Sequence, residues 1–297
     1  MSGASFPAPG IQVLETPCKV NLYLGVHFGR DERGYHRVDS VMVPVALFDT
    51  IEVADSPELE VRHTPALEVA PERTSVWRAA TLLAAELGVE PRVRIDVRVS
   101  IPERAGLGGS SADAGATLRL LAKRWGTDAR DERVVSVARR VGADVAFFLD
   151  PRPGLYVGAG DRLERTFPGF EAPLALVMPE VDGGSTPEAY AEFDRMGEAP
   201  RDYAAACAAL ASGDVRAMAR ELYNNLAPAA CSLCAEVARA ERWLAGQEGV
   251  VGSQVTGSGS CSFALCESVG DADRIAAAAR ARGWRAWSTV TLSHFLP

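Results

Sequence analysis

Short apolar and alternating runs fill the first part of the chain, between 12 and 63, and predict an antiparallel β beginning. Apolar residues at helical spacing follow in 75–88, where the pattern stops at a glycine, which predicts a helix. The stretch 93–101 then alternates with period two and predicts a half-buried strand. This strand leads directly into a segment rich in glycine and serine.

Beyond that segment the pattern predicts both kinds of element. Leu118, Leu121, Ala122 and Trp125 share one face of a helix. Further helices are predicted at 131–142, 199–211, 214–221, 228–246 and 271–283, in a second half that turns alanine-rich from about Thr186. Further strands are predicted at 143–149, 154–160, 173–179, 250–265 and 284–292. Mixed antiparallel strands with helices on one face predict an α+β fold in two lobes, 1–165 and 166–297.

The composition is that of a globular enzyme. Hydrophobic residues make up 47% of the 297 residues and charged residues 24%. A net charge of -8 argues against a nucleic-acid partner, because phosphate backbones are bound by basic surfaces. No apolar run approaches the roughly 20 residues that span a bilayer, and the first ten residues lack signal-peptide character. We therefore expect a cytoplasmic protein with no membrane partner.

The spacing of the six cysteines does not indicate a metal or redox site. Cys231 and Cys234 form one CxxC pair, but no second pair or nearby histidine completes a zinc set. We expect buried helix positions for them and no resident metal.

The segment Gly106–Ser111, "GLGGSS", is the strongest candidate for a binding site. It matches neither GxxxxGK[ST] nor GxGxxG. Glycines let backbone N–H groups approach a phosphate closely, and a helix beginning near Ser111 adds partial positive charge. Taken alone, the segment is equally compatible with a flexible turn capped by Ser110 or Ser111.

Four blocks in order resemble the GHMP kinases over nearly the whole chain. They are "PCKVNLYLGVHFGRDERGYHRVDSVM", "PERAGLGGSSADAGATL", "VGADVAFFL" followed by "GAGDRLE", and "VTGSGSCSF". The resemblance implies a lobe like domain 2 of ribosomal protein S5, a ferredoxin-like lobe, and an active site between them. The first block is most similar to the members that use ATP to phosphorylate the 2-hydroxyl of 4-diphosphocytidyl-2-C-methyl-D-erythritol in the non-mevalonate isoprenoid pathway.

The resemblance also implies residue roles. Asp144 stands at the place of the catalytic aspartate and Lys19 at that of its paired lysine. An aspartate is a weak base, so Asp144 can accept the alcohol proton only late in the transition state, while Lys19 fixes the carboxylate and opposes negative charge. The ATP-binding residues implied are Pro102, Ala105, Gly106, Leu107, Gly108, Gly109, Ser110, Ser111 and Asp113.

The substrate-binding residues implied are Asn21, Tyr35, His36, Tyr190, Gly257, Ser258 and Gly259. Tyr35 would stack on the cytosine, His36 would bond its polar edge, and Tyr190 would cover its other face. Mg²⁺ is expected to arrive with ATP, held mostly by phosphates and water. We expect a monomer or a weak homodimer.

The match is imperfect at four positions. Thr74 stands where relatives commonly have asparagine, Ala146 where proline is frequent, and Asn225 where many have aspartate; these put adenine-side contacts and local rigidity in doubt. Cys18 replaces the usual alanine beside Lys19 and could confer sensitivity to thiol reagents. Two alternatives remain: a GHMP kinase for homoserine or a mevalonate-type alcohol, and a catalytically inactive nucleotide-binding regulator. Retention of Asp144 and Lys19 argues against the second.

Overall fold

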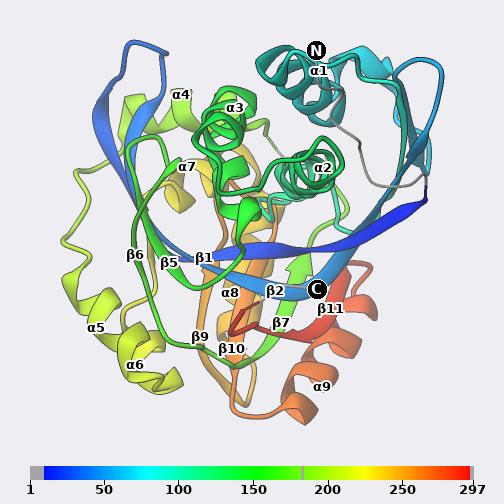
Figure 1. Ribbon diagram of the computed structural model, residues 1–297. Coiled ribbons are helices and arrows are strands. Elements are labelled where there is room, and N and C mark those ends of the chain that lie inside the picture. The colour runs from blue at the N-terminus through cyan, green and yellow to red at the C-terminus, as the bar shows by residue number, and fades with distance from the viewer. Residues whose placement is uncertain (1–9, 182–183, 295–297) are drawn as a thin grey trace.

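The computed structural model describes residues 10–181 and 184–294 (Figure 1). Two long strands cross the molecule and organise a first sheet of seven strands. Its strands are β1 (Gln12–Arg30), β2 (His36–Asp55), β3 (Glu60–Thr64), β4 (Val93–Arg98), β5 (Gly154–Val157), β6 (Arg162–Thr166) and β8 (Tyr223–Asn224). The main path has the order β3-β4-β2-β1-β8, and β5 and β6 branch from β2.

The second sheet has four strands, all antiparallel, in the order β11-β7-β10-β9. Its strands are β7 (Pro173–Met178), β9 (Val250–Val255), β10 (Ser262–Cys266) and β11 (Arg285–Val290). Leu174 and Leu176 of β7 face the core shared with β1 and β2, while Ala175 and Val177 pack against helices on the other face. The period of two in the sequence therefore separates two apolar layers.

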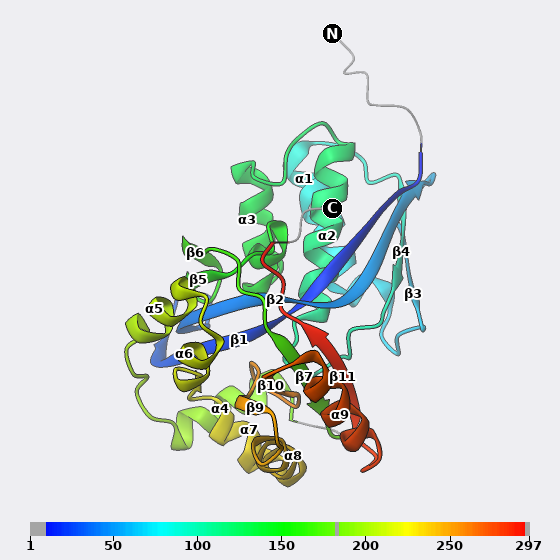
Figure 2. The ribbon, with the colours of Figure 1, turned by 90° about the horizontal axis from the view of Figure 1, so that it is seen from below.

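Helices cover both sheets (Figures 1 and 2). On the first sheet lie α1 (Ser75–Leu87), α2 (Gly109–Arg124) and α3 (Glu132–Val141), with the 3₁₀ helices η1 (Pro71–Arg73) and η2 (Ala143–Leu149). The second half adds α4 (Thr186–Met196), α5 (Ala204–Ser212), α6 (Val215–Arg220), α7 (Ala227–Leu233), α8 (Ala235–Ala245) and α9 (Val269–Arg280). The α+β class expected from the sequence is confirmed.

Four local predictions need correction. The run 143–149 is a 3₁₀ helix rather than a strand, because a short buried apolar run fits either conformation. The predicted helix 228–246 is broken at Cys234, which adopts an extended conformation between α7 and α8. Helix α5 begins at Ala204 instead of residue 199. The exposed strand β6 and the two-residue strand β8 were not predicted.

Strand β8 brings the second half of the chain into the first sheet, where it pairs with Tyr23 and Leu24 of β1. Within the same sheet, Thr291 bridges to Val45 of β2, between the segments of β2 that pair with β5 and with β4. The predicted boundary near Arg165 falls within β6, in the first sheet. It remains a prediction.

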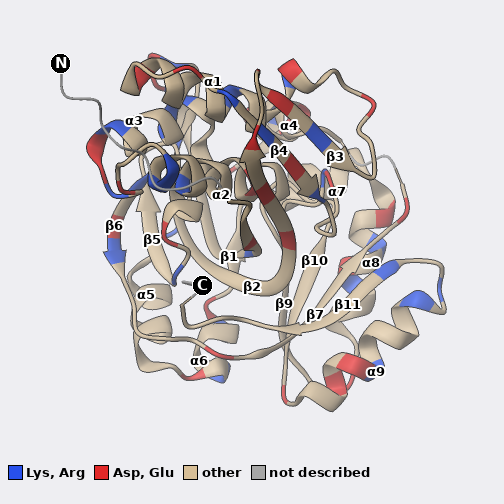
Figure 3. Ribbon diagram, turned by 45° about the vertical axis from the view of Figure 1, so that its right-hand side comes forward, with Lys and Arg blue, Asp and Glu red and all other residues tan. Residues whose placement is uncertain are grey.

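Acidic and basic residues are interspersed on the surface, as Figure 3 shows along α3 and α9. No helix of residues 10–181 and 184–294 is long and apolar enough to cross a membrane.

Candidate active site

One cavity of about 900 Å³ contains most of the predicted site residues. Residues of both halves of the chain line it, from the β3 side at His63 and Val69 to the β1–β2 side at Tyr35 and Tyr190. Its volume lies within the range of small-molecule sites. Of the predicted site residues, Leu107 and Gly259 are not among those that line it.

The glycine loop enters α2 with an uncapped end. Gly106 (φ +71°) and Gly108 (φ +77°) adopt the left-handed conformation that favours glycine. Gly108 is the N-cap of α2, and no side chain caps this end. The alternative of a turn capped by Ser110 or Ser111 is therefore wrong. Helix α2 begins at Gly109, two residues earlier than expected, which leaves its first N–H groups for an anion.

The glycine loop is fastened to the second loop, Gly257–Gly259. The N–H of Ser260 donates to the carbonyl of Arg104 at 3.1 Å, and the N–H of Cys261 to that of Ala105 at 3.2 Å. A Cβ on Gly106 would lie 2.1 Å from the carbonyl oxygen of Thr256. The two loops therefore meet mainly through backbone groups, and Thr256 Oγ1 adds a bond to the carbonyl of Gly106 at 3.4 Å.

Lys19 lies beneath these loops with its ammonium group nearly out of solvent. Its Nζ donates to Asn21 Oδ1 at 2.7 Å and to the carbonyl of Gly106 at 3.0 Å, and lies 3.4 Å from Asp144 Oδ2. An ammonium group has three donors, so these three acceptors satisfy it. The side chain of Lys19 is 3% exposed and that of Asp144 34%. The carboxylate therefore faces the cavity while the lysine holds it from behind.

Asn21 continues this network across β1. Its Nδ2 donates to Ser40 Oγ at 2.8 Å, and its Oδ1 also accepts from Thr256 Oγ1 at 3.2 Å. Asn21 is buried, so the network is rigid and links both lobes below Lys19. Ser40 and Thr256 were not singled out in the sequence, because each becomes significant only through a distant partner.

An aromatic group closes the other end of the cavity. The His36 ring stacks on Tyr190 with centroids 5.2 Å apart and an interplanar angle of 25°. His36 Nδ1 donates to the carbonyl of His27 at 2.9 Å, and Nε2 lies 3.2 Å from Asp194 Oδ1. Tyr35 is 45% exposed and receives the guanidinium of Arg33 on its ring. The stacked pair is thus His36 with Tyr190, and Tyr35 stands apart from it.

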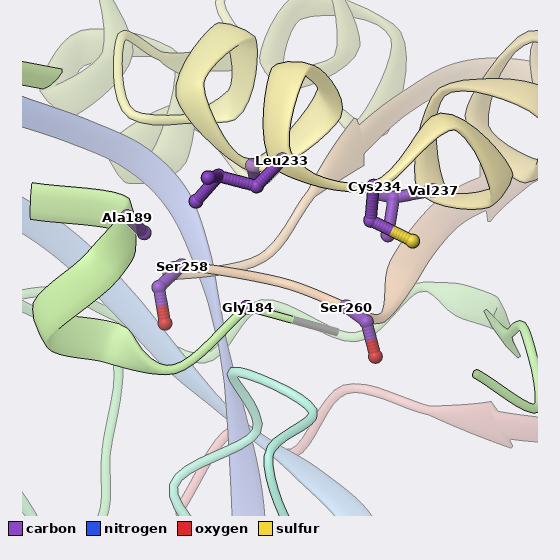
Figure 4. A pocket seen from close by; sticks show the side chains of 8 residues that line it. Gly184, Ala189, Leu233, Cys234, Val237, Ser258 and Ser260 are labelled. Carbon is purple, nitrogen blue, oxygen red and sulfur yellow. The ribbon is translucent and has the colours of Figure 1, made fainter. Parts of the chain in front are cut away.

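Ser258 faces the cavity from the second loop, where its Oγ lies 3.0 Å from Thr186 Oγ1. Behind this loop lies a second, much smaller pocket (Figure 4), with no room for a water molecule. Its lining consists of Gly184, Ala189, Ala230, Leu233, Cys234, Val237, Ser258 and Ser260. This pocket supports the loop and holds no ligand site of its own.

Two departures from the family pattern, Thr74 and Asn225, have structural explanations. Thr74 Oγ1 accepts from the N–H of Trp77 and donates to the carbonyl of Pro71, so it caps α1 at the cavity wall. Asn225 donates from Nδ2 to two carbonyls and accepts the N–H of Val26, which an aspartate could not match. Ala146 lies within η2.

The cysteine predictions are corrected in part. Cys18 is fully buried, and burial raises the pKa of its thiol, so the expected sensitivity to thiol reagents is wrong for the folded protein. Cys231 and Cys234 are half-buried rather than buried, and Cys234 lies at the break between two helices. Within 10–181 and 184–294, no three His, Cys, Asp or Glu side chains are grouped to hold a metal.

Asp113 was predicted to contact ATP, but its carboxyl is 5% exposed and faces Asp49, another buried carboxyl. Asp49 carries no signal in the sequence, because its partner lies far along the chain. Burial and the charge of Asp49 raise the pKa of Asp113 well above its ordinary value.

Two family models match this chain. The GHMP kinases N terminal domain matches residues 74–150, and the GHMP kinases C terminal domain matches residues 206–284. The chain belongs to the GHMP kinases.

Within the GHMP kinases, this chain is similar to proteins that share one more specific name. A protein of Desulfitobacterium hafniense named 4-diphosphocytidyl-2-C-methyl-D-erythritol kinase is 36% identical over 92% of this chain and 93% of its own. The crystal structure of a 4-(cytidine 5'-diphospho)-2C-methyl-D-erythritol kinase is 31% identical, with a TM-score of 0.76, and covers 95% of this chain and 99% of that one. This chain is a member of their family.

A homoserine kinase from Cytophaga hutchinsonii has a TM-score of 0.69 and covers 98% of both chains. At 18% identity, this likeness shows the shared fold alone.

Proposed function

We propose that this chain transfers the γ-phosphoryl group of ATP to the 2-hydroxyl of 4-diphosphocytidyl-2-C-methyl-D-erythritol. The observation that carries the proposal is the pair of Lys19 and Asp144, 3.4 Å apart in the same cavity as the glycine loop and the His36–Tyr190 stack. A phosphate cradle and an aromatic site thus flank one carboxylate. The substrate itself is taken from the relatives' names.

The glycine loop supplies the site for the triphosphate. Its backbone conformation at Gly106 and Gly108 lets the chain approach phosphate oxygens, and the uncapped start of α2 adds the positive end of a helix dipole. Mg²⁺ bound to the phosphates would neutralise charge on the transferred group. Because the described residues offer no metal cluster, the phosphates and water would be its main ligands.

Asp144 and Lys19 then do the chemistry in a single in-line step. The substrate hydroxyl oxygen bonds to the γ-phosphorus as the bond from that phosphorus to the leaving ADP oxygen breaks. The hydroxyl proton passes to the Asp144 carboxylate, which Lys19 holds in place. The buried ammonium group also opposes negative charge where the hydroxyl oxygen and phosphoryl group meet.

The aromatic end would bind the cytidylyl part of the substrate. Tyr190 offers a ring held in place by His36, and Tyr35 offers a second, exposed ring. His36 Nδ1 bonds the carbonyl of His27, whereas its buried Nε2, although within ion-pair distance of Asp194, has no hydrogen-bond partner among the described residues and would bond the polar edge of the cytosine. Asn21 and the Gly257–Gly259 loop lie between the two ends, where the erythritol portion and its phosphates would pass.

The proposal is tested by measuring ATP consumption by the purified protein with Mg²⁺. The candidate alcohols are 4-diphosphocytidyl-2-C-methyl-D-erythritol, homoserine and mevalonate, with a reaction lacking alcohol as control. We expect turnover with the cytidylyl compound alone. Turnover with homoserine or mevalonate would overturn the substrate assignment, and binding of ATP without any turnover would favour an inactive regulator.

The His36→Ala variant is expected to raise the KM for the cytidylyl substrate about tenfold, with the KM for ATP unchanged. Loss of the stack frees Tyr190, and an aromatic pair contributes about 0.5–1.5 kcal/mol. Steady-state kinetics with each substrate varied in turn measures the effect. His294→Ala, at an exposed histidine outside the cavity, should change neither KM. Equal increases in both KM values for His36→Ala would contradict the assignment.

The cytoplasmic location and the monomeric or weakly dimeric state remain predictions from the sequence.

A further inference from the structure

Two carboxyl groups face each other beneath the glycine loop. Asp49 lies on β2 and Asp113 one turn into α2, and they are 1% and 5% exposed. Asp49 Oδ2 and Asp113 Oδ1 are buried, and among the described residues no group other than the facing carboxyl is placed to donate to them. Both residues also border the main cavity. The mechanism above uses neither of them.

The pair connects the two ends of the glycine loop. At the entrance, Asp49 Oδ1 accepts the N–H groups of Ser100 and Ile101, at 2.5 and 2.8 Å. At the exit, Asp113 follows Gly109 in α2 by four residues. A bond between the carboxyls therefore ties the strand that enters the loop to the helix that leaves it.

Two ionised carboxylates cannot share such a site, because burial and mutual repulsion both disfavour the second charge. The nearby ionisable groups reinforce this. Glu103 of the loop raises the pKa of Asp113 further, and the buried thiol of Cys18 on β1 is neutral. Burial raises the pKa of Asp49 as well, but the N–H groups of Ile101 and Ser100, which have no counterpart at Asp113, favour its charged form. The proton therefore resides on Asp113, which donates to Asp49.

We propose that Asp49 and Asp113 position the ATP-binding loop through one shared proton. The inference rests on the proposed function, in which this loop holds the triphosphate. A neutral Asp113 also limits the pair to one negative charge near the start of α2, where the phosphates would bind. Asp113 is thus a positioning residue that holds the loop from behind.

The test compares Asp113→Asn with Asp113→Ala. The amide of asparagine can donate to Asp49 without a titrating proton, whereas alanine removes the bond and leaves Asp49 unpartnered. ATP affinity is measured by calorimetry without the alcohol, and the KM of each substrate is measured from about pH 6 to pH 9. We expect Asp113→Ala to weaken ATP binding roughly tenfold and to leave the alcohol KM unchanged. Asp113→Asn should bind ATP like the wild type at neutral pH.

The pH dependence of ATP affinity distinguishes a shared proton from a purely structural role of Asp113. Because the pKa of Asp113 is raised, its proton is present below that raised value and is lost as the pH rises through it. Wild-type affinity for ATP should therefore decline on the alkaline side, and that of Asp113→Asn should not. The wild type and Asp113→Asn suffice for this comparison, even if Asp113→Ala does not fold.

Three results would overturn the inference. They are an ATP affinity of Asp113→Ala within twofold of the wild type, a loss in Asp113→Asn as large as in Asp113→Ala, and the same pH dependence in wild type and Asp113→Asn. A wild-type protein that does not bind ATP at neutral pH would instead overturn the proposed function, and this inference with it.

Discussion

The Asp144→Asn variant is expected to lose about 10²- to 10⁴-fold in kcat while its affinity for ATP stays within about twofold of the wild type. Asparagine has nearly the same shape as aspartate, but its amide cannot accept the proton of the substrate hydroxyl. Lys19 keeps its bonds to Asn21 and to the carbonyl of Gly106, so the phosphate cradle stays in place. Steady-state kinetics and calorimetric titration with ATP measure the two quantities separately.

A matched control is Asp150→Asn. Asp150 is also a paired carboxylate, bonded to Arg152, but it does not border the cavity. Its replacement should leave kcat unchanged. A near-normal kcat for Asp144→Asn would remove that residue from its role as the proton acceptor. A loss of ATP affinity as large as the loss of kcat would show that the variant damages the phosphate site instead.

The Gly106→Ala variant should be destabilised by about 2–5 kcal/mol and should lose its ATP site. A left-handed conformation costs a non-glycine residue about 1–2 kcal/mol, and overpacking adds about 1–3 kcal/mol. The added Cβ would lie 2.1 Å from the carbonyl oxygen of Thr256, which is backbone and cannot rotate away. The two glycine loops would have to separate. Urea denaturation and ATP titration measure the two effects.

Gly126→Ala separates the strain from the clash. Gly126 follows α2 with φ +77°, close to the value at Gly106, and no heavy atom lies within 4 Å of a Cβ placed there. This variant should therefore be destabilised by about 1–2 kcal/mol, with ATP binding intact. Equal destabilisation of the two variants would mean that the loops can move apart at little cost.

Most elements could be predicted from the sequence because their apolar periodicity is local. Helix α1 and strand β4 lie almost where the pattern places them. The run 143–149 could not be assigned this way, because four of its residues, including Phe147 and Phe148, are buried without any period of two. Strand β6 is exposed along its whole length and therefore has no apolar pattern at all.

Those residues of the candidate site that lie in short sequence motifs could be predicted from the sequence. The resemblance pointed to Lys19 and Asp144, and the structure brings them together from opposite ends of the first lobe. The environment of a side chain was not predictable. Asp113 appears in the motif as a phosphate-loop residue, yet its carboxyl lies under the loop, because Asp49 of a distant strand meets it there.

Strand β8 has a consequence for how the protein is made. Tyr223 pairs with Tyr23, so 200 further residues must leave the ribosome before the outer neighbour of β1 exists. At 5–20 residues per second this takes roughly 10–40 s. During translation the β1 edge of the nascent first sheet is therefore open until residues 223–224 have left the ribosome, and over that interval its unpaired N–H and C=O groups can pair with another chain.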